Sequence, residues 1–505
     1  MLSKNSFRKS VRLLLLLVPM ILITLNSMVT AADQKEDPNP WRFPSEFFIG
    51  TAISGFQAEM GCPNMPESLC NDTNCDWYAY ATSDLNPPDP FMLSGQDPAE
   101  VGPGFWELYP EDMNRAAYEL NNNSLRISIE WSRIFPTPTD ECEDFKCLMK
   151  LANKKALLKY RLMFSSMKKR GLIPMVTLNH YTLPLWIHDP VAFRYDYYMG
   201  TSTCQEKGWV DRERIVREIA KFAGFVARVF GRQVDHWATL NEPMAVVVPG
   251  YLFPSEFRTN PPGVSPVTPG LPPEAVVAGF ETAKTVIAAM IEAHARMYDA
   301  VTLADKFDAD RDGNPAEVGL VFAMIPTIPV DPENNLDTQA ANNMFYLLNQ
   351  SFLDGACLGM IDEDLDGVAE YREDLDNRID FLGINYYYAL QVTGIPFPIF
   401  PDLSLLTTFT PESMGAFNYF HPQGLFDMVM FAHHRYDLPI YITENGTPLI
   451  DENYKSTWIG YMVSHLMALI QATWHGADVR GYYYWTLMDN YEWNHGMLEL
   501  RFGLY

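Results

Sequence analysis

Two short motifs in the sequence place a glutamate in a setting suited to acid–base or nucleophilic chemistry. Thr239–Pro243 reads TLNEP and contains Glu242, and Thr443–Gly446 reads TENG and contains Glu444. Either motif alone has a simple structural explanation, because Asn-Glu-Pro can open a helix and Asn-Gly is a common turn. Together they supply the two carboxyl groups that cleavage of a glycosidic bond requires. One protonates the departing oxygen, and the other attacks the sugar carbon or activates water.

Eight short, apolar, β-rich runs recur along the chain, separated by longer segments with helical periodicity. The amphipathic pattern is clearest in residues 212–230, where Ile215, Ile219 and Phe222 recur at helical spacing. Strand and helix alternating eight times predict an α/β fold, a (β/α)8 TIM barrel that forms a single catalytic domain over residues 41–505. A doubly wound open sheet is the alternative, but the Gly-rich phosphate loop typical of that fold does not follow the first strand. The predicted strands are Phe47–Ser54, Leu125–Trp131, Ile173–Tyr181, His236–Glu242, Val318–Ile325, Phe381–Tyr388, Ile440–Glu444 and Tyr482–Leu487.

Polar residues gather where the predicted strands end. In a barrel of parallel strands these ends converge on one mouth, where catalytic groups sit. A single polar residue at a strand end is more often structural than functional, but its repetition around the barrel favours a shared site. The residues concerned are Gln57, Arg126, His180, Asn241, Glu242, Asn385, Tyr387, Glu444, Asn445, Trp485 and Glu492.

Several ordered stretches carry a family resemblance. They are FFIGTAISGFQAEM, LRISIEWSRIFP, VTLNHYTLPLWIHDP, TLNEP, GINYY, YITENG and YWTLMDNYEWNHG. From Trp41 to Tyr505 the chain resembles glycoside hydrolase family 1, and within it the archaeal-type β-glycosidase branch of β-glucosidases and β-galactosidases. The resemblance implies a retaining enzyme in which Glu444 attacks the sugar C1 while Glu242 first donates and then recovers a proton. Retention places the two carboxyl groups about 5–5.5 Å apart.

The resemblance also implies roles for the residues around the two glutamates. Arg126 and Tyr387 match family residues that contact the nucleophile, so Glu444 is expected to be held ionised, with Asn385 as further support. Glu242 must start protonated and is expected to carry a raised pKa. In the sugar site of the family, one residue stacks on the sugar ring, and Trp485 matches it. Five further residues hydrogen-bond the sugar hydroxyl groups, and they are matched by Gln57, His180, Asn241, Glu492 and Trp493.

The expected function is double-displacement hydrolysis of terminal, non-reducing β-D-glucosides or β-D-galactosides, presented as small β-glycosides or oligosaccharides. A carboxylate at Glu492 suits free 4- and 6-hydroxyl groups and would repel a 6-phosphate, which disfavours a 6-phospho-β-glycosidase. No cofactor is expected to be required for catalysis. Two alternatives remain. One is a glycosyltransferase or transglycosidase that uses the same two glutamates, and the other is a non-catalytic carbohydrate-binding relative.

Three features depart from the family pattern. Tyr181 stands where a tryptophan usually follows the histidine, and Phe417–Gln423 replaces a more acidic, Trp-containing stretch. Both lie near the expected site and bear on specificity rather than on the reaction. Tyr505 falls just after the eighth predicted strand, where relatives continue into a closing helix. We therefore expect either an incomplete sequence or a barrel that lacks its final helix, which would leave apolar surface uncovered.

Two acidic loops are not explained by the resemblance. The first fits an EF-hand-type calcium loop, with aspartates at positions 1, 3 and 5, glycine at position 6 and glutamate at position 12. Its residues are Asp362, Asp364, Asp366, Gly367 and Glu373. The second loop repeats only the first half, as Asp308, Asp310, Asp312 and Gly313. The alternative is that both are solvated acidic loops. Because both precede predicted strands, a structural calcium ion would lie on the face opposite the site and stabilise the barrel.

The composition and the N-terminus bear on location and partners. The formal net charge of −26 argues against nucleic acid and anionic membranes as partners, since both require a basic footprint. Residues 1–32 combine a basic start, a short apolar run and small residues, which predicts a cleaved signal peptide and a secreted chain without membrane contact. The alternative is a membrane anchor, although the run is shorter than the roughly 20 residues that span a bilayer. Export permits disulfides, and the seven cysteines predict loop-stapling pairs with at least one thiol left over.

Overall fold

The computed structural model describes residues 43–44, 46–394, 407–409, 421–448, 455–497 and 500–505. The predicted signal peptide, residues 1–32, lies outside the described residues, and so do residues 417–420 of the divergent stretch. Within the described ranges, no helix is both long enough and apolar enough to cross a membrane.

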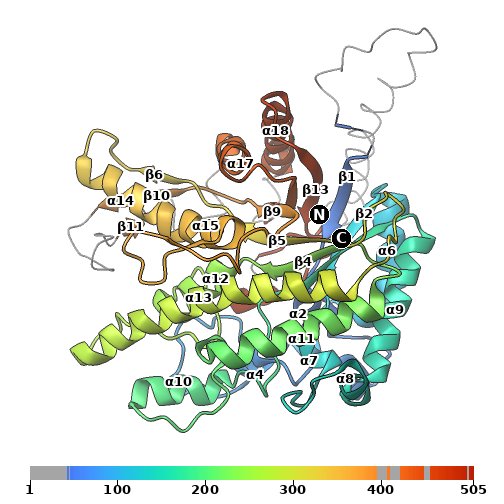
Figure 1. Ribbon diagram of the computed structural model, residues 1–505, viewed down its shortest axis with the longest axis horizontal. Helices are drawn as coiled ribbons and strands as arrows, with labels where there is room; N and C mark the ends of the chain where they lie inside the picture. Colours follow the sequence, from blue (N-terminus) through green and yellow to red (C-terminus); the bar gives the residue numbers. More distant parts are fainter. Residues whose placement is uncertain (1–42, 45, 395–406, 410–420, 449–454, 498–499) are drawn as a thin grey trace, which may run out of the picture.

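Eight parallel strands close into a barrel in the order β1-β13-β12-β9-β5-β4-β3-β2 (Figure 1). The predicted (β/α)8 TIM barrel is thereby confirmed, and each predicted strand overlaps an observed one. Most residues of these strands are apolar or aromatic because parallel strands are buried on both faces. The barrel strands are β1 Phe48–Ala52, β2 Ser124–Ser128, β3 Ile173–Asn179, β4 His236–Asn241, β5 Glu317–Ala323, β9 Phe381–Asn385, β12 Ile440–Asn445 and β13 Val479–Trp485.

Helices surround the barrel. The predicted amphipathic helix is α11, Arg212–Phe230, which the Asp211 side chain caps by accepting a hydrogen bond from the Arg214 amide. It packs against α13, Pro273–Ala304, which has 32 residues and is therefore about 48 Å long. The first turns of α13 extend beyond the barrel, at the lower left of Figure 1. Further helices are α2 Gly55–Glu59, α4 Asp76–Thr82, α6 Phe105–Asn114, α7 Trp131–Ile134, α8 Phe145–Leu151, α9 Lys154–Lys169, α10 Pro190–Met199, α12 Pro243–Val247, α15 Ser351–Leu358, α17 Pro422–Tyr436 and α18 Lys455–Trp474.

A small second sheet lies at one side of the barrel mouth. Its strands are β6 Thr327–Pro329, β10 Leu390–Gly394 and β11 Thr407–Phe409, in the order β11-β10-β6. Strands β6 and β10 follow the C-terminal ends of β5 and β9, so this sheet and its covering helix α14, Asn335–Phe345, border the mouth (Figure 1).

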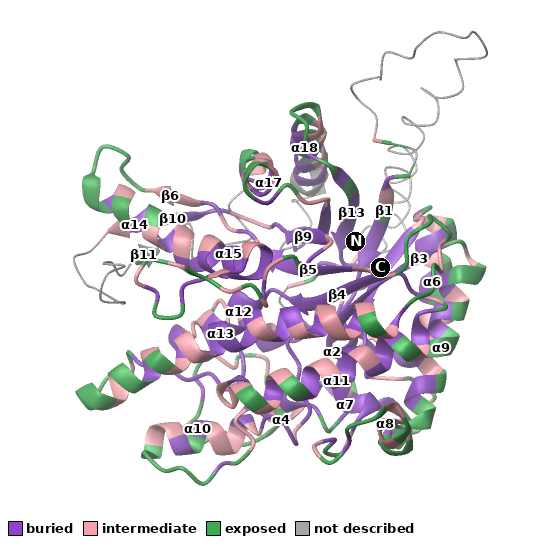
Figure 2. Cartoon of the chain, viewed as in Figure 1, coloured by how far each residue is buried: buried purple, intermediate pink, exposed green. Residues whose placement is uncertain are grey.

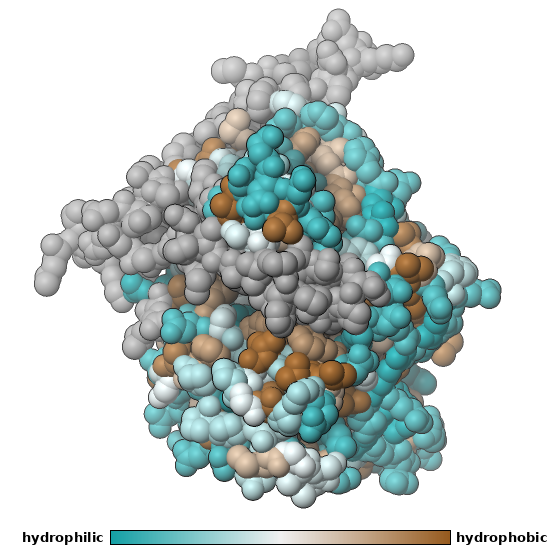
Figure 3. Space-filling model, turned by 90° about the vertical axis from the view of Figure 1, so that its left-hand side faces the viewer, coloured by the Kyte–Doolittle hydropathy of each residue, from teal (hydrophilic) through white to brown (hydrophobic). Residues whose placement is uncertain are grey.

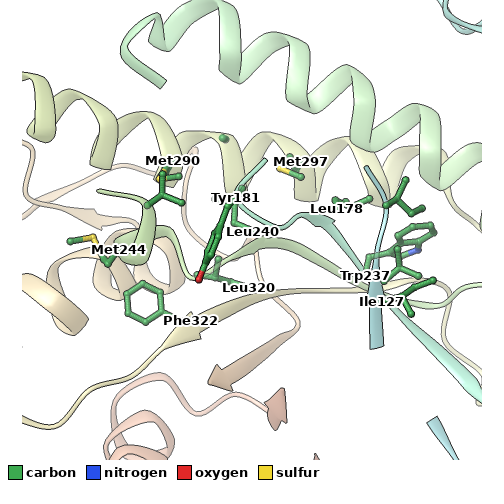
Figure 4. Packing of buried hydrophobic residues seen from close by; sticks show 14 of the residues in the cluster. Ile127, Leu178, Tyr181, Trp237, Leu240, Met244, Met290, Met297, Leu320 and Phe322 are labelled. Carbon is green, nitrogen blue, oxygen red and sulfur yellow. The ribbon is translucent and has the colours of Figure 1, made fainter. Parts of the chain in front are cut away.

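The main core lies between the strands and the helices. Figure 2 shows the barrel strands and the inward faces of the helices as buried. In the packing view of Figure 4, strand residues such as Leu178, Trp237 and Leu240 lie below Met290 and Met297 of α13. The barrel interior holds a separate, smaller cluster that includes Met175, Phe381, Tyr441, Tyr483 and Trp485. These two layers fix where the strand ends point, and so fix the mouth.

The cysteines and the end of the chain complete the fold. Two disulfides staple loops, Cys62–Cys70 and Cys142–Cys147, as the sequence predicted, and three buried cysteines are free: Cys75, Cys204 and Cys357. After β13 the described residues form only the short 3-10 helix η7, Trp493–His495, before Tyr505.

Candidate active site

The two glutamates meet at the barrel mouth. Glu242 directly follows β4, and Glu444 lies near the end of β12. Both side chains are buried and line one cavity of about 330 Å³. Residues from opposite parts of the sequence therefore converge as the strand pattern predicted.

Glu444 is held by a cation and a hydroxyl group. Arg126 Nη1 lies 2.7 Å from Glu444 Oε1, and the Tyr387 hydroxyl donates to Oε2 at 2.6 Å. The structure thus places the two predicted supporting residues on the carboxylate. However, burial raises the pKa of Glu444 to about 7, and the charge of Glu242 raises it as well, while Arg126 and Tyr387 lower it. Arg126 and Tyr387 therefore act on Glu444 in the expected direction, and desolvation acts against them.

Glu242 is oriented by two donors. Asn385 Nδ2 donates to Glu242 Oε1 at 2.7 Å, and the Tyr181 hydroxyl donates to Oε2. The sequence identified Tyr181 as a departure from the family but did not assign it a contact with the acid/base. Its place after His180, at the end of β3, was the available signal, since neighbouring strand ends face one mouth.

The predicted sugar-binding residues form two layers. His180, Trp485, Glu492 and Trp493 line the cavity itself. Behind them, Gln57 Nε2 donates to Glu492 Oε2 at 3.1 Å. Asn241 also lies in the second layer, where it contacts both Arg126 and His180. The sequence placed all six residues at the site but did not separate those that line the cavity from those that support them.

His180 offers an unused polar atom to a ligand. Burial and the nearby cations Arg126 and Arg258 hold its pKa well below the usual range, so the ring is neutral. Its Nε2 faces the Asn241 amide at 3.2 Å, whereas the buried Nδ1 has no hydrogen-bond partner in the described part of the chain. A buried polar atom without a partner is costly, and a sugar hydroxyl would satisfy it.

Arg258 is a residue of the site that sequence reasoning missed. It lies in the loop after η3, Val248–Leu252, with Nη1 3.6 Å from Glu492 Oε1. Its guanidinium also sits 5.3 Å from the ring centre of Tyr181 and 5.4 Å from that of Trp493. Burial raises the pKa of Glu492 to about 7, and Arg258 opposes this rise. No sequence motif identifies this arginine as a site residue, because it lies in an irregular loop.

Three residues of the site have left-handed backbone conformations. Tyr181, Glu242 and Trp493 have φ angles of 71°, 45° and 44°. Non-glycine residues in this region are strained by roughly 1–3 kcal/mol each, and such strain persists where the surroundings impose it. The surroundings here are tightly packed, since the Trp493 ring stacks on both Phe56 and His180.

The two acidic loops are only partly as predicted. Carboxylate oxygens of Asp362, Asp364 and Asp366 lie within 4.8 Å of one another, but within the described chain Glu373 is not part of this group. The predicted twelfth ligand is therefore not in place, because residues 370–371 turn back to pair as β8 with β7, Met360–Ile361. In the second loop Asp308 and Asp310 cluster with Asp235, and Asp312 is not part of that group of described residues.

The position of the first loop also differs from the expectation. Its Glu363 pairs with Arg212, the first residue of α11, at 2.9 Å. Helix α11 is about 28 Å long and ends just before β4, so its first residue lies on the mouth side of the helix layer. The first loop therefore lies on the flank of the barrel. The second directly precedes β5, where the Glu317 amide donates to the Asp235 carbonyl, and lies opposite the mouth as expected.

The mouth of this parallel barrel holds two carboxyl groups. One of them faces a cation, and both are surrounded by polar and aromatic side chains. This arrangement is typical of a glycoside hydrolase. Residues 39–505 match the family model described as Glycosyl hydrolase family 1, and the chain belongs to that family. The predicted family is thereby confirmed.

Relatives of known function and structure support the same assignment. The chain is 35% identical to a β-galactosidase of Pyrococcus woesei, over 92% of each chain. Among solved structures it resembles the β-glycosidase of Thermosphaera aggregans, with a TM-score of 0.73 and 30% identity over 92% of each chain. It also resembles the hyperthermophilic β-glucosidase of Pyrococcus furiosus, with a TM-score of 0.70 and 31% identity over 92% of this chain and 91% of that one.

Proposed function

We propose that the chain is a retaining β-glycosidase that hydrolyses terminal β-D-glucosides and β-D-galactosides. The observation that carries the proposal is the unequal setting of the two glutamates. Glu444 faces Arg126 and Tyr387, and Glu242 faces Asn385 and Tyr181.

The first step forms a glycosyl-enzyme. Two carboxyl groups that share one site bind a proton between them, since two adjacent charges repel. Because Arg126 contacts Glu444 at 2.7 Å, the negative charge rests on Glu444 and the proton on Glu242. Glu444 then attacks C1, the bond from C1 to the leaving oxygen breaks, and Glu242 gives its proton to that oxygen. The donors Asn385 and Tyr181 stabilise the carboxylate that Glu242 becomes in this step.

The second step releases the sugar. Glu242, now a carboxylate, removes a proton from a water molecule, and the water oxygen bonds to C1 on the face that the leaving group vacated. The ester bond to Glu444 breaks, and both glutamates return to their starting states. Two inversions at C1 give net retention of the β configuration.

The choice of glycone rests on the polar inner end of the cavity. Glu492 accepts from Gln57 and pairs with Arg258, and the free Nδ1 of His180 is available to a hydroxyl group. Such a surface suits an uncharged pyranose with several hydroxyl groups, and Trp485 offers an aromatic face to the ring. The printed names of the relatives, β-galactosidase and β-glucosidase, support the same two glycones.

A panel of nitrophenyl β-glycosides, with NMR of the first product anomer, tests this function. We expect turnover of the glucoside and galactoside, with the β anomer appearing first. An α anomer as first product would contradict the assigned roles, and no turnover of any β-glycoside would contradict the function. Adding an alcohol acceptor separates hydrolysis from transglycosylation, the alternative chemistry of the same two glutamates.

We also propose that the chain is exported and that its first acidic loop binds a structural calcium ion. Export is supported by the pattern of residues 1–32 and is compatible with the Cys62–Cys70 and Cys142–Cys147 pairs. Calcium is supported by the clustered carboxylates of Asp362, Asp364 and Asp366, which are the hard oxygen ligands that calcium prefers. Sequencing the N-terminus of the mature chain tests export, and an intact Met1 in cell-associated protein would contradict it.

A further inference from the structure

One wall of the catalytic cavity is apolar. It is built by the segments that follow three adjacent barrel strands, β4, β5 and β9. The side chains that line it are mostly flexible and aliphatic, with few hydrogen-bonding groups. They include Met244, Val248, Met324, Met344, Leu347 and Tyr388. In Figure 3, which faces the side of the molecule where α14 lies, apolar side chains gather near the centre.

The apolar wall lies on the leaving-group side of the reaction. The glycone residues come from the other part of the barrel, with Gln57 after β1, His180 after β3 and Glu492 after β13. The apolar segments instead flank Glu242, since α12 begins at the next residue and the Met324 amide donates to the Asn385 carbonyl. A general acid must face the oxygen that departs, so the aglycone extends along this wall.

Two polar residues beside this wall are already engaged. The Ser255 hydroxyl donates to the Arg258 carbonyl at 3.4 Å. His495, which lines the cavity from η7, has its Nε2 3.1 Å from the Phe257 carbonyl oxygen. A second sugar placed here would bury hydroxyl groups among methionine and leucine side chains. Each hydroxyl group left unpaired weakens binding by about tenfold or more.

Given the proposed function, on which this inference rests, we propose that the substrates are amphiphilic β-glycosides, in which a sugar is joined to an aliphatic or isoprenoid alcohol. The unbranched, adaptable side chains of Met244, Met324 and Met344 suit a flexible chain. Burial of each methylene group strengthens binding by about three- to fourfold, so selectivity accumulates along the chain.

A homologous series of substrates tests the inference. Methyl, butyl, hexyl and octyl β-D-glucosides and galactosides are compared with cellobiose and lactose by kcat/KM. We expect kcat/KM to rise about threefold per methylene until the chain leaves the cavity, with both disaccharides far below the octyl glycosides. A flat series, or disaccharides at least as good as octyl glycosides, overturns the inference.

Glycosyl fluorides distinguish failure of this inference from failure of the proposed function. Their leaving group is a single atom that needs neither an aglycone site nor a strong acid. Turnover of β-glucosyl or β-galactosyl fluoride with a flat alkyl series would overturn the aglycone assignment alone. No turnover of either fluoride would overturn the proposed function, and this inference with it.

Two variants locate the effect on the apolar wall. In Leu347→Gln the ratio of kcat/KM for octyl over methyl glucoside should fall about tenfold, because a polar amide replaces a side chain of similar size. Should that variant fail to fold, the half-buried Val248→Thr carries the test, with an expected fall of about threefold. Leu303→Gln, at a leucine that is 78% exposed on α13, is the matched control and should keep the parental ratio. An unchanged ratio in a folded wall variant overturns the inference.

Discussion

The molecule contains two kinds of carboxylate cluster, and they handle charge differently. At the barrel mouth, Glu444 faces Arg126 and Tyr387, and Glu492 faces Arg258 and Gln57. In the first acidic loop, Asp362 accepts from two backbone amides and from the Tyr346 hydroxyl, whereas Asp364 has no protein donor among the described residues. The protein therefore supplies cations to the carboxylates at the mouth, whereas within the described residues no cation pairs with Asp362, Asp364 or Asp366.

This difference matches the different tasks of the two regions. Buried charges that must react have to be held in one geometry, so the mouth is preorganised, and its carboxylates and Arg126 are almost fully buried. The loop is partly exposed, and the carboxylates of Asp362, Asp364 and Asp366 lie close together without a neutralising side chain in the described part of the chain. Removing a mouth carboxylate should abolish chemistry, whereas removing a loop carboxylate should change only stability.

The largest effect is expected for Glu444→Ala. Loss of the nucleophile should lower kcat by at least about 10⁴-fold, because no other group can form the ester to C1. Azide should restore turnover and give a glycosyl azide of inverted configuration, which NMR detects. Glu363→Ala in the acidic loop is the matched control and should retain parental kcat. Parental kcat in Glu444→Ala would disprove the nucleophile assignment and, with it, the contrast between mouth and loop.

Glu242→Ala should show a loss that depends on the leaving group. General acid catalysis contributes about 10²–10⁴-fold, so hydrolysis of an alkyl glycoside should fall by that factor. A dinitrophenyl glycoside departs without a proton and should form the glycosyl-enzyme at a much less affected rate. Pre-steady-state release of dinitrophenol measures this rate directly. Equal losses with both substrates would remove Glu242 from the acid role.

The pH profile should report on the setting of Glu444. The pKa of Glu444 is raised to about 7, so it becomes protonated below that pH and kcat/KM should fall about tenfold per pH unit. The Tyr387 hydroxyl donates to this carboxylate and lowers its pKa. Tyr387→Phe removes that donor, so the pKa of Glu444 rises and the acid limb should move to higher pH. An acid limb at the parental pH would show that the Tyr387 hydroxyl does not stabilise the charged nucleophile.

The sequence predicted those parts of the site that short, contiguous patterns encode. The barrel followed from eight apolar runs, and α11 from the spacing of Ile215, Ile219 and Phe222. Glu242 and Glu444 were identified because strand ends of a barrel must converge. In each case a local pattern and a general rule of the fold sufficed.

Features that depend on three-dimensional packing were not predicted. Arg258 reaches the mouth from an irregular loop whose path no periodicity encodes. The pKa of Glu444 depends on how far burial outweighs Arg126, which a motif does not reveal. Glu373 lies outside the acidic group because residues 370–371 pair as β8 with β7, which directs the following chain away from the aspartates.

Tyr181→Phe should have a moderate effect that sharpens the assignment of the mouth. The hydroxyl donates to Glu242, so its loss frees the carboxyl group from one of two orienting contacts. One such hydrogen bond is worth about 1 kcal/mol, and kcat for alkyl glycosides should fall about five- to tenfold. KM and the turnover of dinitrophenyl glycosides should change less. Tyr118→Phe, at a tyrosine that is 66% exposed, is the control, and a uniform loss across all leaving groups would indicate general damage instead.

The smallest effect is expected on removal of calcium. Chelation should lower the melting temperature by about 2–5 °C, because a ligand that binds only the folded state stabilises it in proportion to its occupancy. Added calcium should restore the melting temperature, and Asp364→Asn should abolish the shift. Because the mouth carries its own cations, kcat at 25 °C should be the same with and without chelator. Loss of kcat without a change in melting temperature would place the cation at the mouth. It would contradict the assignment of catalysis to the mouth carboxylates and of stability to the loop carboxylates.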